Sequence, residues 1–107
     1  MVYVKAEINV LPGKMDEFCE LMKQLLPPIG ELQWKLVASF INRSGRQGTV
    51  LNIWQIPDAN AFLDLGAQLA KNDKARALLN AIHECIEPET ATLVSETSFS
   101  PGLGGGA

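Results

Sequence analysis

Three side chains are candidates for proton-transfer chemistry. Glu7 and Tyr3 lie on the same side of the alternating stretch VYVKAEINV, where Glu7 is a candidate general base and Tyr3 a candidate acid. His83 is the one histidine in the sequence, and imidazole is the side chain that most readily gains and loses a proton near neutral pH. We therefore take Glu7, Tyr3 and His83 as candidate catalytic residues.

Each of these residues also has a purely structural interpretation. Glu7 could form an ion pair with Lys5, its neighbour on the same side of the strand. His83 lies beside the apolar stripe of a predicted helix, where a histidine is commonly a hydrogen-bonded boundary residue. The sequence alone favours these structural interpretations.

Four further residues are candidates for substrate binding: Asn9, Ser39, Asn52 and Trp54. Amide and hydroxyl groups can orient a carbonyl or hydroxyl by hydrogen bonding, and an indole can pack against an apolar ligand. The sequence contains no phosphate-binding, dinucleotide-binding, zinc-protease or serine-hydrolase motif. We therefore expect no cofactor and no metal.

The composition limits the class of protein. A chain of 107 residues fits one domain, which we place at residues 1–100, followed by a flexible Gly-rich tail at 101–107. The net charge of −3 and the scattered Lys and Arg residues argue against a nucleic-acid partner. No apolar run is long enough for a membrane span, so we expect a cytoplasmic protein without a membrane partner. We expect both cysteines, Cys19 and Cys85, to be small buried residues.

The periodicity of apolar residues gives the order of the elements. Strands are predicted at residues 2–10, 36–42, 49–56 and 90–99. One helix is predicted at 14–26, ending before Pro27 and Pro28, and a second begins after Asp58 and breaks near 71–73, where Asp73 can cap its second part. The order β-α-β-β-α-β predicts an α+β, ferredoxin-like protomer with both helices on one face of a four-stranded antiparallel sheet.

The other face of this sheet would be uncovered. Its residues on the first strand are Tyr3, Lys5, Glu7 and Asn9. On the strand 49–56 we assign Leu51 and Ile53 to the helices, so the uncovered face receives the alternate residues Val50, Asn52, Trp54 and Ile56. This mixture of aromatic and polar groups predicts a homodimer in which two sheets enclose a ligand cavity.

Three sequence motifs occur in a fixed order: LPGKMDEFCELMKQLLPP, WKLVASFINRSG and LNIWQIPDANA. They resemble the helix start, the Trp-Lys-Leu-Val strand and the W-x-x-P-D strand end of NIPSNAP-like proteins, which belong to the dimeric α+β-barrel group. The resemblance extends from Tyr3 to Leu93. It implies a ferredoxin-like protomer that dimerises into a barrel with an internal pocket, without implying one chemistry.

The resemblance also bears on particular residues. Asn52 stands where family members often have His, so an acid or base role at that position does not carry over. Haem-degrading relatives in the wider group use an Asn on the first strand with a Trp and a His in the second helix. Asn9 and His83 could take two of these places, but the predicted second helix has no Trp, which disfavours haem degradation.

We therefore expect a cofactor-independent enzyme of natural-product type that cyclises or isomerises a polyketide-like or other apolar oxygenated substrate. Two alternatives remain open. One is a cofactor-free monooxygenase of the antibiotic-biosynthesis type acting on a phenol, and the other is a non-catalytic homodimer that binds a small apolar or aromatic ligand.

Overall fold

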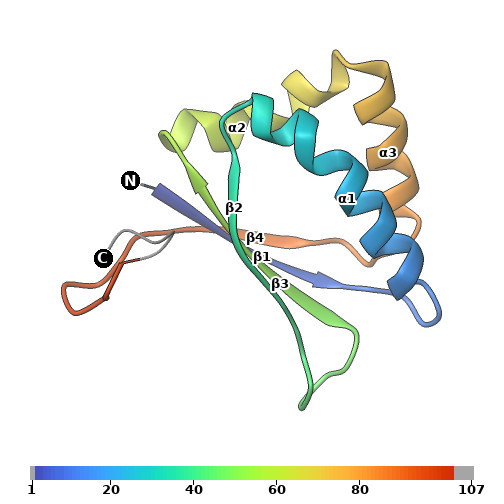
Figure 1. Ribbon diagram of the computed structural model, residues 1–107, viewed down its shortest axis with the longest axis horizontal. Helices are drawn as coiled ribbons and strands as arrows, with labels where there is room; N and C mark the ends of the chain where they lie inside the picture. The colour runs from blue at the N-terminus through green and yellow to red at the C-terminus, as the bar shows by residue number, and fades with distance from the viewer. Residues whose placement is uncertain (1, 103–107) are drawn as a thin grey trace.

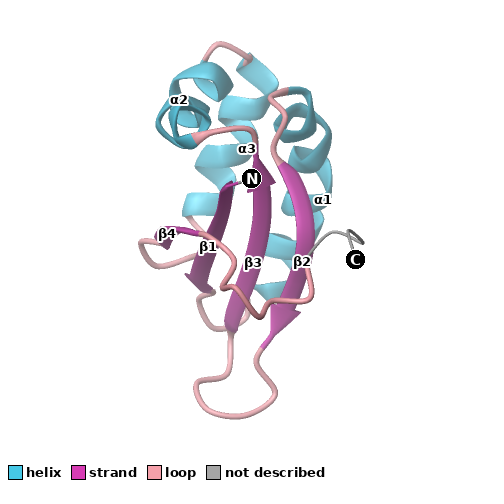
Figure 2. Cartoon of the chain, turned by 90° about the vertical axis from the view of Figure 1, so that its left-hand side faces the viewer, coloured by secondary structure: helices cyan, strands magenta, loops and turns pink. Residues whose placement is uncertain are grey.

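The computed structural model describes residues 2–102, which form one sheet covered on one side by helices (Figure 1). The elements in chain order are β1 (Val2–Asn9), α1 (Met15–Glu31), β2 (Lys35–Ile41), β3 (Thr49–Ile56), α2 (Ala59–Ala70), α3 (Asp73–His83) and β4 (Thr90–Val94). All neighbouring strands pair antiparallel, in the order β2-β3-β1-β4. Figure 2 shows the strands side by side with the three helices behind them. The predicted ferredoxin-like arrangement is confirmed.

β1 lies between β3 and β4 and alternates between two environments. Val4, Ala6 and Ile8 are buried against the helix layer. A fully buried Val or Ile side chain contributes roughly 1.5–3 kcal/mol to stability relative to an exposed one. Burial of this side of β1 therefore fixes which face of the sheet receives the helices.

The predicted orientation of β3 is wrong. In the β1–β3 register Val4 lies opposite Trp54, and Ala6 lies opposite Asn52. Directly opposed residues on paired strands share a face, so Trp54 and Asn52 lie on the helix side together with Val50 and Ile56. Leu51 and Ile53, which are only partly buried, take the uncovered face. β3 carries apolar residues on both sides, so its orientation follows from its register with β1.

α1 is longer than predicted. It continues through Pro27 and Pro28 to Glu31, although neither proline can donate a backbone hydrogen bond. Leu25 and Ile29, on either side of the two prolines, are buried in the core. Tertiary packing of this apolar face therefore outweighs the local preference to stop.

The predicted break in the second helix is confirmed, since α2 ends at Ala70 and α3 begins at Asp73. As predicted, Asp58 caps α2, and its Oδ1 accepts a hydrogen bond of 2.9 Å from the Ala61 N–H. The cap of α3 is Asn72 rather than Asp73, and its Oδ1 accepts from the Ala75 N–H at 3.1 Å. Both caps satisfy backbone donors that a helix start leaves unpaired.

The last strand is shorter than the predicted 90–99. β4 ends at Val94, and the chain turns back near the N-terminal end of β1 (Figure 1). There the Tyr3 hydroxyl donates a hydrogen bond of 3.2 Å to Glu96 Oε2, and Glu96 Oε1 accepts from the Ser100 hydroxyl at 2.9 Å. Residues 103–107 of the expected Gly-rich tail lie outside the described residues.

Candidate functional site

A cavity of about 230 Å³ lies between the helix layer and the sheet. Residues of α1, α2 and α3 form its upper wall, and residues of β1, β3 and β4 form its floor. Most of the lining is apolar. Apart from the indole groups, its polar side chains are Asn52, His83 and Glu89. An apolar hollow with a few polar groups is the usual form of a small-molecule site.

Small residues make room for this cavity. Ser39, Asn52, Ala6 and Ala91 follow one another across β2, β3, β1 and β4 in a single row of the sheet. We call these four residues the floor row. Ala6 and Ala91 line the cavity floor, and Gly66 of α2 lines the wall. Gly66 is exposed, and a Cβ placed on it would meet no atom within 4 Å, so this edge of the cavity has room for a larger side chain.

Asn52 is the polar anchor of the floor row. Only 3% of its surface is exposed, and its Oδ1 accepts a hydrogen bond of 2.6 Å from the hydroxyl of Ser39 on edge strand β2. Asn52 therefore lies on the cavity floor with one side of its amide fixed. Ser39 itself does not line the cavity but an apolar groove between α1 and β2.

His83 and Glu89 lie at the mouth of the cavity, where α3 ends and β4 begins. Both are exposed, and both also line an outer concavity together with Ile86, Glu87 and Pro88. Partial burial raises the pKa of the Glu89 carboxyl, and the charge of His83 offsets part of that increase. These two side chains thus form an ionisable pair that a bound molecule would meet.

An aromatic cluster forms one end of the cavity. Trp34 packs edge-on against Trp54, with ring centroids 5.8 Å apart, and stacks on Phe62 at 6.3 Å. The Trp34 indole donates a hydrogen bond of 3.2 Å to the backbone oxygen of Ala61. Trp34 is therefore both a packing residue and part of the cavity wall.

Three predicted site residues lie on the other face of the sheet. Tyr3 is covered there by the segment after β4, and its burial, followed by the Glu96 charge and hydrogen bond, raises its pKa. Glu7 is exposed and lies 3.8 Å from Lys5 Nζ, measured from its Oε1. Asn9 Oδ1 accepts a hydrogen bond from the Thr49 hydroxyl at 2.8 Å. None of the three lines the cavity, and the prediction that Glu7 and Trp54 share a face of the sheet is wrong.

Glu89 was missing from the predicted site. In the sequence it is one of several acidic residues after the last helix, next to Pro88, and nothing local distinguishes it. The available signal was topological: the end of the helix carrying His83 and the start of the last strand must meet at one edge of the sheet. The structure thus joins His83, Asn52 and Trp54, from the predicted set, with Glu89.

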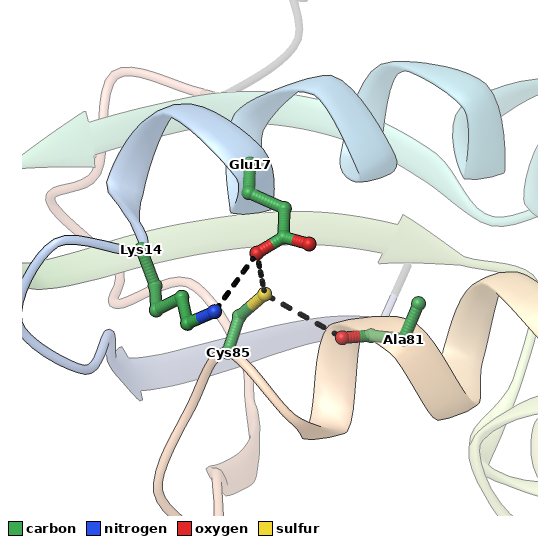
Figure 3. Close-up of polar contacts among 4 residues, drawn as sticks. All are labelled: Lys14, Glu17, Ala81 and Cys85. Atoms are coloured by element: carbon green, nitrogen blue, oxygen red, sulfur yellow. Dashed lines mark hydrogen bonds and ion pairs between the residues drawn. The ribbon is translucent and has the colours of Figure 1, made fainter.

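Cys85 is a buried free thiol beside the first turn of α1. Its Sγ lies 3.4 Å from Glu17 Oε2 and 3.5 Å from the Ala81 backbone oxygen, and Lys14 Nζ pairs with the same Glu17 oxygen (Figure 3). Burial, then the neighbouring Glu17, raises the pKa of the Cys85 thiol. The thiol is therefore a poor nucleophile and serves to link α1 to the end of α3. Cys19, by contrast, is exposed, so its predicted burial is wrong.

Metal-binding groups and membrane-spanning helices are two further features that could indicate a function. In residues 2–102 no group of three or more His, Cys, Asp or Glu side chains is placed to hold a metal ion. Across the same residues, no helix combines the length and apolar character needed to cross a membrane.

The fold and cavity define a ferredoxin-like α+β protein with a small-molecule-sized hollow between its helices and its sheet. A model of the NIPSNAP family matches residues 7–101, and the chain belongs to this family. No curated protein matches the sequence.

Solved structures share the fold. A NIPSNAP family protein from Agrobacterium tumefaciens is 21% identical, with a TM-score of 0.79 over 94% of this chain and 98% of that chain. An uncharacterized NIPSNAP domain protein from Burkholderia xenovorans is 19% identical, with a TM-score of 0.78 over 95% and 100%. An antibiotic biosynthesis monooxygenase is 20% identical, with a TM-score of 0.66 over 91% and 99%. At these identities the similarity establishes the fold alone.

Proposed function

We propose that this protein is a cofactor-independent enzyme that binds a small, largely apolar, oxygenated molecule between its helices and its sheet and transforms it by proton transfer. One observation carries the proposal. The ionisable side chains that line the apolar cavity are His83 and Glu89, which lie together at its mouth. A base beside an apolar binding site is the arrangement that proton abstraction from a bound molecule requires.

The cavity volume favours a particular size of substrate. About 230 Å³ equals the space of roughly eight water molecules at about 30 Å³ each. This volume suits a single ring or a small fused pair of rings. It is too small for a polycyclic polyketide, so we favour a smaller substrate than the sequence suggested.

In the proposed reaction, the imidazole of His83 removes a proton from a carbon next to a carbonyl group. The electrons of the broken C–H bond form a C=C bond, and the carbonyl π electrons move to oxygen to give an enolate. If a C=C bond is conjugated with this enolate, return of the proton to the far carbon shifts the double bond and isomerises the substrate. Alternatively, attack of the enolate carbon on a second carbonyl closes a ring, and the alkoxide formed there takes the proton. Because the pKa of Glu89 is raised, a fraction of its carboxyl groups stays protonated at pH values where an ordinary carboxyl is ionised. Glu89 is therefore suited to return the proton.

A monooxygenase reaction is the second candidate, supported by the aromatic wall of Trp34, Trp54 and Phe62, against which a phenol ring could pack. Here the phenol would lose its proton to His83, and the electron-rich ring would react with O₂. One phenol with an unsubstituted para position and one O₂ would give one quinone and one water. Oxygen uptake with 1-naphthol, whose position para to the hydroxyl is unsubstituted, faster than in protein-free buffer and with formation of the 1,4-quinone, would favour this reaction.

We also propose that a second copy of the chain covers the uncovered face of the sheet. That face carries the partly exposed apolar side chains of Leu51 and Ile53 beside Lys5 and Glu7. A two-fold arrangement would place opposite charges of the two copies together while burying the apolar groups. Native mass spectrometry should show a dimer that Ile53→Glu dissociates. A monomeric wild type would contradict this part of the proposal.

Deuterium exchange tests the catalytic proposal directly. The probe is 2-indanone, a small ketone with acidic hydrogens next to its carbonyl, followed by NMR in D₂O. Wild-type protein should accelerate exchange, and His83→Gln should lower that acceleration by about 100-fold or more. Glu7→Gln, on the other face, is the matched control and should retain it. Binding without accelerated exchange would instead support a non-catalytic ligand-binding protein.

A further inference from the structure

The amide of Asn52 has a defined orientation. The Ser39 hydroxyl lies 2.6 Å from Oδ1 and must be the donor, because an amide oxygen can only accept. Ser39 lies on β2, so this bond turns Oδ1 toward the edge strand and leaves Nδ2 free of it. The residue opposite Asn52 on β1 is Ala6, which is too small to fill the space above the floor row.

Nδ2 of Asn52 is left with hydrogens to donate. Within residues 2–102 this nitrogen has no hydrogen-bond acceptor, although only 3% of the surface of Asn52 is exposed. Trp54, 6% exposed and in the same cavity wall, has an indole N–H that is also without an acceptor among the described residues. Among the described residues no fully buried side-chain nitrogen lacks a hydrogen-bond partner, so these two donors are accessible to small molecules, and a ligand oxygen in the cavity could accept from them.

The charges of the cavity restrict the ligand further. No Lys or Arg side chain lines the wall. At the mouth, Glu89 has no ion-pair partner within the described residues, whereas Glu87 pairs with Arg46 at 3.0 Å. A carboxylate or phosphate on the ligand would leave water for a wall with no Lys or Arg and with the Glu89 carboxyl at its mouth. The lining therefore disfavours anionic ligands.

We infer that the cavity selects a neutral, enolisable ketone or aldehyde of one or two small rings, whose carbonyl oxygen accepts a hydrogen bond from Asn52 Nδ2. This inference rests on the proposed proton-transfer function. When the substrate loses its proton, negative charge develops on that oxygen, and a hydrogen bond to a charged acceptor is stronger than one to a neutral acceptor. Asn52 thus binds the ground state and stabilises the enolate, and Ser39 is a positioning residue that acts through Asn52.

Binding of three probes of similar size tests this inference. They are 2-indanone, its analogue 2-methyleneindane with C=CH₂ in place of C=O, and the anion phenylacetate. Calorimetry should show that wild-type protein binds the ketone at least about tenfold more tightly than either of the others, and Asn52→Leu should abolish this preference. Asn9→Leu is the matched control, because Asn9 has the same kind of hydroxyl partner on the opposite face.

Variants of Ser39 test the positioning role and provide a second route if Asn52→Leu fails to fold. Ser39→Ala should lower the ketone preference several-fold, and Ser39→Thr, which keeps the hydroxyl, should restore it. A purely structural role for Ser39 would change thermal stability without changing the ratio of the two affinities.

The outcomes separate this inference from the proposed function. Equal affinity of the wild type for ketone and alkene, tighter binding of phenylacetate, or no binding of any probe overturns the inference. His83-dependent deuterium exchange would still support proton transfer in the first case. Ketone preference that depends on Asn52, without exchange, would support the inference about recognition and overturn the catalytic proposal.

Discussion

The two faces of the sheet carry nearly the same hydrogen bond in different surroundings. On the helix side, Ser39 donates to Asn52 Oδ1 at 2.6 Å, and on the uncovered side Thr49 donates to Asn9 Oδ1 at 2.8 Å. Asn9 is half-buried, so water can satisfy the rest of its amide. Asn52 is buried beside an apolar cavity, where its remaining donors could meet a ligand. The same bond therefore stabilises one face and prepares a binding site on the other.

The ionisable groups of the two faces differ in the same way. Glu7 on the uncovered face pairs with Lys5 in water-exposed surroundings. Glu89 on the helix side has a raised pKa because its carboxyl is partly buried beside an apolar cavity. A carboxylate in water is ordinarily a structural group, whereas a partly desolvated one at a cavity mouth suits proton transfer. Variants at matched positions of the two faces test whether these surroundings decide what each group does.

The largest expected effect comes from filling the cavity. Gly66→Leu should place a side chain in the empty space of α2 and lower the affinity for 2-indanone by at least about tenfold, as calorimetry can measure. The same change removes a helical glycine and should stabilise the fold by up to about 1 kcal/mol. Gly30→Leu in α1 is the control, because Gly30 has equally open space but does not line the cavity. Equal binding by both variants would place the ligand elsewhere.

A second effect concerns pH. Because the pKa of Glu89 is raised in the folded state, the folded protein holds this proton to higher pH than the unfolded chain does. The contribution of Glu89 to the free energy of unfolding is therefore largest below the ordinary carboxyl pKa. It decreases as the pH rises through the raised pKa of the folded state. Glu89→Gln should remove this decline, which urea unfolding at a series of pH values would detect. Parallel pH profiles for the wild type and Glu89→Gln would argue against the desolvated carboxyl.

A smaller effect is expected for Tyr3→Phe. The variant loses the hydrogen bond to Glu96 and should lower the free energy of unfolding by about 1 kcal/mol. Because Tyr3 lies across the sheet from the cavity, the deuterium-exchange rate of 2-indanone should not change. A loss of exchange without a loss of stability would restore Tyr3 as a catalytic acid.

The smallest effect is expected for the ion pair on the uncovered face. Glu7→Gln should change the free energy of unfolding by no more than about 0.5 kcal/mol, because exposed ion pairs contribute little. Chemical denaturation at two salt concentrations measures this change. This value applies to the monomer, at protein concentrations too low for the proposed dimer to form, and a larger change there would contradict the exposed ion pair. A larger change only at concentrations where the dimer forms would support burial of Glu7 by the second copy.

The sequence predicted the order of strands and helices because apolar periodicity and capping residues are local signals. It also predicted the break near 71–73, but it did not predict that α1 continues past Pro27, since the burial of Ile29 is a tertiary effect. The site was predicted less well. Asn52 and Trp54 were selected by residue type but assigned to the wrong face. β3 carries apolar residues on both of its faces, so only its pairing with β1 shows which face is turned toward the helices. Glu89 gains its significance from the cavity beside it, which no local pattern reveals.

The most direct test of the account is to locate the bound molecule by NMR. Titration of isotope-labelled protein with 2-indanone reports on methyl groups of both faces of the sheet at once. We predict shifts for Val4, Ile8 and Ile82, which line the cavity, and unchanged signals for Leu51, Ile53 and Val94 on the uncovered face. Shifts confined to Leu51, Ile53 and Val94 would contradict the assignment of the functional site to the helix side.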